Sequence, residues 1–157
     1  MIAEAGIAKT TLYRHFGSKE QLIVAVLRRI HERFLDDMRG VVEERAPMAE
    51  DKLLATFDFL EIWFLDESFY GCPLVRAAGE YGERNSAVFQ ESLLHKRLMV
   101  AYFEELARGA GLSEPRDIAE EINLLHEGAI SVAHISGSPE PARRAKAAAA
   151  RLLARGA

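Results

Sequence analysis

The sequence predicts an all-α protein, a helix-turn-helix remnant followed by an orthogonal and antiparallel bundle of helices. Apolar residues recur at three- and four-residue spacing along nearly the whole chain of 157 residues, as they do on one face of an amphipathic helix. Gly and Pro interrupt this pattern near residues 47, 71–73, 109–111 and 137–139, which marks the expected helix ends. Alternating apolar and polar runs, the signal of β-strands, are essentially missing.

The first predicted element is the second half of a helix-turn-helix. Gly6 can adopt the positive φ that the turn between two short helices requires. The following helix, from about Ala8 to Phe16, has a polar outer side that can reach base edges and phosphates in a DNA major groove. The polar residues on that side are Lys9, Thr10, Thr11 and Arg14.

The same stretch resembles the TetR family of transcriptional regulators. The resemblance is carried by Ala5-Gly6, Thr11-Leu12-Tyr13, His15-Phe16, Ser18-Lys19 and Leu22. It implies a one-component transcriptional regulator, a repressor by family habit, that binds operator DNA as a dimer and is released by a small-molecule effector. It also implies that Tyr13 and Lys19 hold phosphates while Lys9, Thr10 and Thr11 face bases. Arg14 and His15 complete the predicted DNA-binding residues.

The sequence departs from the family pattern in two ways. Ala8 stands where a Ser or Thr usually caps the recognition helix, and a missing cap costs about 1 kcal/mol. The family's first helix and the start of its second are absent, so we expect an N-terminally truncated DNA-binding unit. Two origins stay open. One is a shortened gene product that forms dimers unable to bind DNA. The other is a longer regulator whose translation start was assigned too late or whose N-terminal segment was lost. The alternative function is therefore a ligand-binding and dimerisation module without specific DNA binding.

The distribution of charge agrees with a DNA-binding N-terminal end. The formal net charge of -4 argues by itself against a nucleic-acid binder. Residues 1–34, however, hold six Lys or Arg and three acidic residues. The basic charge therefore lies on the motif and the acidic excess on the rest of the chain, as expected of a protein that presents one end to phosphate.

Helices follow one another beyond the motif. Ser18 can cap a long helix to about Glu44, and Pro47 separates it from the next. Further helices are predicted at about Glu50–Asp66, Pro73–Glu80 and Ser86–Gly109. We divide the chain into a partial DNA-binding domain, 1–44, whose connecting helix starts at about residue 18, and a ligand-binding and dimerisation domain, 45–157.

The last two predicted helices, about Pro115–Ser136 and Glu140–Arg155, form an antiparallel pair around Gly137-Ser138-Pro139. The second is rich in Ala, which lets it pack closely against a partner helix. The outer face of such a pair can form a four-helix bundle with a second subunit, and the TetR resemblance implies the same. We therefore predict a homodimer through residues 115–155, which also suits a reader of two symmetric half-sites.

A second stretch, Phe69 to Tyr81, looks like the Gly-Cys-Pro segment of one TetR branch, so the resemblance spans nearly the whole chain. It implies a small-molecule effector bound in a mostly apolar cavity between the helices. The candidate ligand-binding residues are aromatic or polar and lie on apolar helix faces: Phe57, Trp63, Phe64, Cys72, Tyr81, His95, Tyr102 and His126. Phe57, Phe64 and Tyr102 can equally be plain core, and His126 a core histidine with a hydrogen-bond partner.

The single cysteine, Cys72, excludes an internal disulfide and, with no membrane span or secretory signal in the sequence, predicts a cytoplasmic protein. Near a helix N-terminus its thiol is either a reactive sensor or a buried structural group. Cys72 with His95 or His126 lacks the local context of a catalytic pair, so we predict no enzyme. His126 and His134 are too far apart on a helix to share a metal, and no glycine-rich phosphate loop occurs. We predict no metal and no cofactor.

Overall fold

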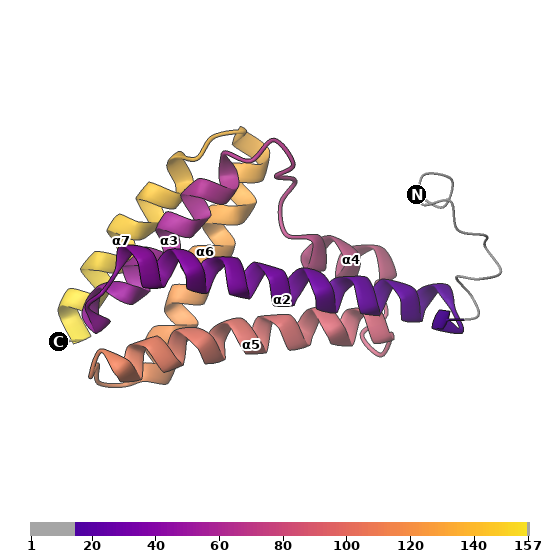
Figure 1. Ribbon diagram of the computed structural model, residues 1–157, viewed down its shortest axis with the longest axis horizontal. Helices are drawn as coiled ribbons and strands as arrows, with labels where there is room; N and C mark the ends of the chain where they lie inside the picture. Colours follow the sequence, from indigo (N-terminus) through magenta and orange to yellow (C-terminus); the bar gives the residue numbers. More distant parts are fainter. Residues whose placement is uncertain (1–14, 157) are drawn as a thin grey trace.

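The computed structural model describes residues 15–156, and this part of the chain consists of six α-helices without a strand. The helices are α2 (Lys19–Arg45), α3 (Ala49–Phe64), α4 (Pro73–Tyr81), α5 (Ala87–Gly109), α6 (Pro115–Ser136) and α7 (Glu140–Gly156) (Figure 1). The predicted all-α class is confirmed, and each of these helices lies within two residues of its predicted ends. The predicted recognition helix falls largely on residues outside the described part.

The start of α2 is fixed by two local signals that the sequence contains. The Ser18 hydroxyl accepts a hydrogen bond from the Gln21 backbone N–H at 3.1 Å, as an N-cap does. Gly17 adopts φ 66°, and a Cβ there would lie 2.7 Å from the Gln21 amide oxygen. The chain therefore enters α2 through a turn that favours glycine.

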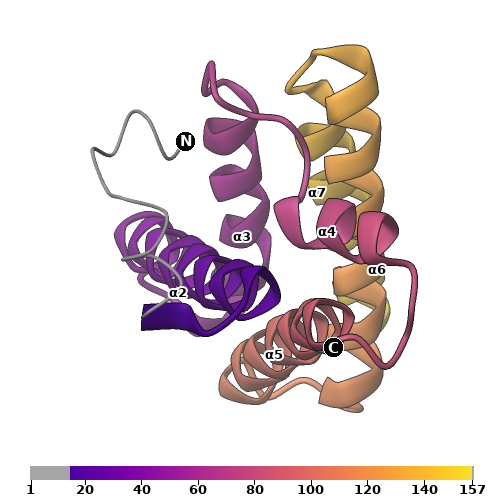
Figure 2. The same cartoon turned by 90° about the vertical axis from the view of Figure 1, so that its right-hand side faces the viewer.

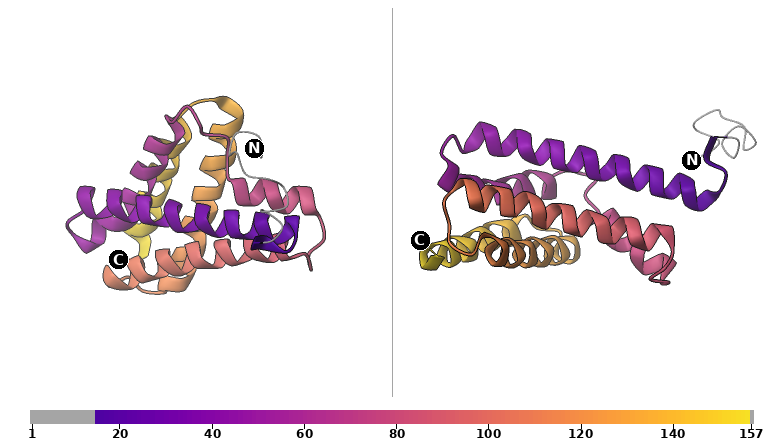
Figure 3. Two further views of the ribbon diagram at one scale, coloured as in Figure 1. Left: turned by 45° about the vertical axis from the view of Figure 1, so that its right-hand side comes forward. Right: turned by 90° about the horizontal axis from the view of Figure 1, so that it is seen from below.

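The two long helices α2 and α5 run side by side in the same direction, and α4 packs against the first half of α5 (Figures 1 and 3). Helices α3, α6 and α7 stand across the other half of this pair, as the end-on view makes clear (Figure 2). The innermost side chains of the core are fully buried; the largest are Phe57, Phe103, Met38, Leu53 and Leu60.

Helices α6 and α7 form the predicted antiparallel pair. Gly137 ends α6 in the left-handed region, at φ 63°, and its N–H bonds back to the Ala133 carbonyl. The small side chains Ala142 and Ala149 of α7 are buried. Two ion pairs fasten α7 to α3: Lys146 to Asp58 at 2.6 Å and Arg143 to Glu61 at 2.7 Å. Within residues 15–156 no helix is long and apolar enough to cross a membrane.

Candidate ligand cavity and DNA-binding segment

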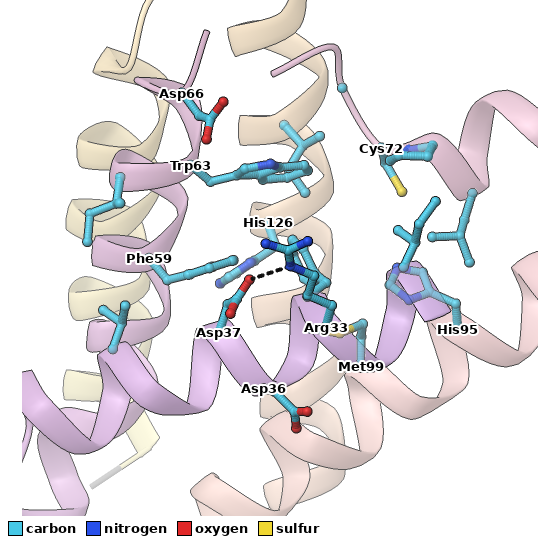
Figure 4. Close-up of a pocket in the computed structure, with 18 of the residues that line it drawn as sticks. Arg33, Asp36, Asp37, Phe59, Trp63, Asp66, Cys72, His95, Met99 and His126 are labelled. Atoms are coloured by element: carbon cyan, nitrogen blue, oxygen red, sulfur yellow. Dashed lines mark ion pairs between the residues drawn. The ribbon is translucent and has the colours of Figure 1, made fainter. Parts of the chain in front are cut away.

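A cavity of about 850 Å³ lies between α2, α3, α5, α6 and the segment that leads into α4. One wall comes from α3, where Phe59 and Trp63 lie one helical turn apart and extend into the cavity (Figure 4). Cys72 and His95 lie at the opposite end. The size of the cavity suits a small organic ligand.

Three aromatic side chains of the lining lie close together. Phe34 of α2 meets Phe59 and Trp63 edge to face, with ring centroids 5.0 Å away in both cases. Phe59 and Trp63 are nearly parallel, with 15° between their planes and 6.4 Å between their centroids. Beside them, Arg33 and Asp37 of α2 form an ion pair of 3.9 Å at the cavity rim (Figure 4). The cavity therefore combines an aromatic interior with charged groups at its edge.

His95 connects the cavity to α2. Its Nδ1 lies 2.8 Å from the Nδ1 of His31, so one imidazole donates this hydrogen bond and the other accepts it. Burial lowers the pKa of His95 to about 3, and the positive charge of Lys96 and the neighbouring His31 act in the same direction. Burial also lowers the pKa of His31. Both rings are therefore neutral at pH 7, the state that the shared hydrogen bond requires.

Helices α2 and α5 are tied together along their length by polar contacts. The Glu20 carboxylate accepts a bond from the Ala87 backbone N–H at 2.9 Å, at the first turn of both helices. Further along, Arg28 pairs with the buried Glu91 at 2.9 Å, and the pair of histidines follows. A shift of α2 therefore disturbs contacts that begin at the cavity and end beside the predicted DNA-binding segment.

His126 is a buried histidine whose hydrogen bond is satisfied. The Thr56 hydroxyl donates to the Leu53 carbonyl at 2.6 Å, so it accepts from the His126 Nε2–H at 2.8 Å. Burial lowers the pKa of His126 to about 3, and Lys96 contributes in the same direction. The ring packs between Phe57 and Phe103, at centroid distances of 4.3 and 4.7 Å, and also borders the cavity.

Cys72 is buried and lies at the N-cap of α4. Lys96 donates a hydrogen bond to its Sγ at 3.7 Å and pairs with Glu127 at 2.5 Å. The thiol thus lines the cavity next to an ammonium group that is itself held in place by a carboxylate. No group of three or more potential metal-binding side chains occurs in the described part of the chain.

Four of the eight predicted ligand-binding residues line the cavity: Trp63, Cys72, His95 and His126. The other four lie outside this lining: Phe57, Phe64, Tyr81 and Tyr102. Phe57 is only 1% exposed and belongs to the core, while Tyr102 packs under the Arg39 guanidinium, 5.2 Å from its ring centroid. Sequence reasoning missed Phe59 as a lining residue, although its spacing of four from Trp63 places both on one side of α3.

The predicted DNA-binding residues lie mostly outside the described part of the chain, namely Lys9, Thr10, Thr11, Tyr13 and Arg14. The two that the structure describes, His15 and Lys19, are both exposed. Lys19 is the first residue of α2, directly after the Ser18 cap. Its ammonium group is thus available at the end of α2 that adjoins the motif.

Comparison with known proteins agrees with this architecture. The sequence model described as Bacterial regulatory proteins, tetR family, matches residues 2–26. The solved structure of SCO4454, a TetR-family transcriptional regulator from Streptomyces coelicolor, has a TM-score of 0.87 at 22% identity and covers 99% of this chain and 82% of its own. NemR from E. coli, in its reduced form, has a TM-score of 0.79 at 23% identity over 94% of this chain and 81% of its own.

A putative TetR-family regulator from Streptomyces avermitilis, sav143, shares the fold with a TM-score of 0.74 at 22% identity, over 94% of this chain and 84% of its own. No curated protein matches the sequence. The fold of the described part is that of these TetR-family regulators. Residues 2–26 match the sequence model of the TetR family of transcriptional regulators, and the described helices have the fold of its solved members.

Proposed function

We propose that this chain is a one-component repressor that binds operator DNA as a homodimer and is released by a small-molecule effector bound in the cavity. The observation that carries the proposal is the position of α2. Its middle forms a wall of the cavity through Phe34 and Asp37, and its first residue, Lys19, directly follows the helix-turn-helix segment. A ligand that displaces α2 therefore changes the placement of the DNA-binding segment.

A stripe of exposed apolar residues on α6 supports the dimer. Leu124, Val132 and Ile135 are 69%, 56% and 83% exposed, and their spacing places them on one side of the helix. Gly128 lies within the same stripe, and a Cβ there would meet nothing within 4 Å. Exposed apolar side chains in such a row are typical of a subunit interface. We assign the interface to α6 and α7.

The DNA-binding part of the proposal is tested by fluorescence anisotropy with a labelled duplex at several salt concentrations. Because Tyr13 and Lys19 are assigned to phosphates, Tyr13→Phe and Lys19→Ala should weaken binding to all duplexes alike. Lys19→Ala should also lower the salt slope by about one phosphate contact. Arg144→Ala, which removes one exposed charge from α7, is the control and should leave the slope unchanged.

A loss confined to one duplex sequence would contradict these roles of Tyr13 and Lys19. A wild-type dimer that binds small molecules but binds no duplex would favour the alternative, a ligand-binding and dimerisation module. Effector action is tested in the same assay, since compounds that bind the cavity should lower the anisotropy of the bound duplex. To shift the protein from almost fully DNA-bound to almost fully free, the effector must bind the DNA-free conformation more tightly than the DNA-bound one by about 5.5 kcal/mol.

A further inference from the structure

The three aromatic rings of the cavity are arranged as a slot and a plug. Phe59 and Trp63 of α3 are nearly parallel, with centroids 6.4 Å apart. The Phe34 ring of α2 stands across them, 5.0 Å from each centroid and tilted by 83° and 73° from their planes. Phe34 therefore fills one side of the space between the two faces.

We propose that the effector is a flat aromatic compound that inserts between Phe59 and Trp63 by displacing the ring of Phe34, and that this displacement moves α2. The inference rests on the proposed function, because it names the ligand class and the trigger for the same cavity. Both faces of the slot and the plug line the cavity, and Figure 4 shows Phe59 and Trp63 one above the other.

The spacing of the slot favours a flat ligand. Carbon atoms in contact lie about 3.5–4.0 Å apart, so two rings that hold a third between them stand about 7 Å apart. The 6.4 Å between the ring centroids of Phe59 and Trp63 is the upper limit of the separation of their faces, so side-chain rotations on α3 must widen the slot before a ring enters. A saturated ring system of the same size is thicker and would need a larger opening.

The Phe34 side chain is also less enclosed than the aromatic side chains of the surrounding core. Phe57 and Phe103 are 1% and 0% exposed, whereas Phe34 and Trp63 are only partly buried. A partly buried ring at the edge of a cavity loses fewer contacts when it moves than a ring enclosed on all sides. Phe34 can therefore leave the slot without opening the core around Phe57.

Displacement of Phe34 would be transmitted through His95. Phe34 and His31 are three residues apart on α2 and lie on the same side of the helix. His95 contacts both: its ring centroid lies 6.1 Å from that of Phe34, and its Nδ1 bonds to His31. A ligand that drives Phe34 away from α3 would move the segment of α2 that carries His31 and loosen this link to α5.

The test compares 2-naphthol with decahydro-2-naphthol, which has the same carbon skeleton and hydroxyl but is not flat. Binding to the full chain, without DNA, is measured by calorimetry and by proton NMR of the ligand. We expect 2-naphthol to bind at least tenfold more tightly than decahydro-2-naphthol. We also expect its ring protons to shift upfield, because they would lie over the faces of Phe59 and Trp63.

Variants separate the slot from a general apolar cavity. Phe34→Ala should bind 2-naphthol at least fivefold more tightly than the wild type, because no plug has to leave. Trp63→Leu should abolish the upfield shift. Met38→Leu, a conservative change in the core outside the cavity lining, should preserve both affinity and shift. Equal affinity for the two compounds, weaker binding by Phe34→Ala, or absence of the upfield shift in the wild type would each overturn the proposal.

A separate arm with DNA distinguishes this inference from the function on which it rests. If 2-naphthol inserts as described but a bound duplex keeps its affinity, the slot stands and ligand-induced release fails. If other compounds release the duplex while 2-naphthol does not enter the slot, the function stands and the slot is overturned. If Phe34→Ala does not fold, the comparison of the two compounds in the wild type and in Met38→Leu still decides whether the slot exists.

Discussion

At the scale of single residues, hydrogen bonds hold the polar side chains inside the bundle and determine which atom donates and which accepts. His126 is the clearest case, since Thr56 uses its only proton for the Leu53 carbonyl and must accept from His126. In the described part of the chain no buried side-chain N or O atom lacks a hydrogen-bond partner. Removal of one partner therefore leaves the other unsatisfied.

Thr56→Val tests this bond. Valine preserves the shape of the side chain but leaves a ring nitrogen of His126 without a partner, so the free energy of unfolding should fall by about 1–3 kcal/mol. Thr56→Ser preserves the hydroxyl and is the matched control, with a smaller loss from its missing methyl group. The measurement is urea denaturation followed by circular dichroism. Equal losses in the two variants would mean that the methyl group, rather than the bond, matters at this position.

The buried histidines also predict how stability depends on pH. The pKa of His126 is about 3 in the folded chain and about 6.5 when unfolded, so the folded state binds fewer protons. The resulting stability is complete above pH 6.5 and is lost as the pH falls toward 3. Between pH 7 and pH 5 the loss from this histidine should be about 2 kcal/mol.

His126→Gln can donate to Thr56 but does not titrate in this range. Its free energy of unfolding should therefore fall less than that of the wild type between pH 7 and pH 5, whatever the stability of the variant at pH 7. Urea midpoints at a series of pH values give the comparison. Parallel pH profiles for the wild type and the variant would exclude His126 as a source of the dependence.

At the scale of helices, the exposed stripe of α6 carries the dimer proposal. A charge at its most exposed position, in Ile135→Glu, should raise the dissociation constant of the dimer by more than tenfold, because the carboxylate would be buried without a partner. Leu65→Glu makes a comparable change at the end of α3, where the residue is 65% exposed, and should leave the dimer intact. Sedimentation equilibrium measures both, and equal effects would place the interface elsewhere.

The helices were predictable because their signals are local. Ser18 and Ser86 cap α2 and α5 through bonds to the backbone three residues on, and Pro115 and Gly137 lie at the two ends of α6. The cavity lining was harder to predict, since it depends on which faces of several helices meet. Phe57 and Phe59 are two residues apart on α3, yet one is enclosed by His126 and the other borders the cavity.

At the scale of the whole molecule, α2 joins the two activities that the proposal assigns to the chain. It packs on α3 and α5, borders the cavity at its middle and begins beside the segment that matches the family's DNA-binding region. Periodicity could predict this long helix but could not predict that His31 would meet His95, because that contact depends on the register between α2 and α5. The route that we propose from the cavity to DNA thus depends on tertiary packing.

Selection of duplexes from a random-sequence pool by the purified full chain tests the central claim most directly. A dimeric reader with two symmetric helix-turn-helix segments should enrich a sequence with two-fold symmetry, whose half-sites lie about one turn of DNA or a multiple of it apart. The account predicts this enrichment, and it predicts that the Lys19→Ala variant selects the same sequence with lower affinity. A pool that stays random after repeated selection by a chain shown to be a dimer would contradict it.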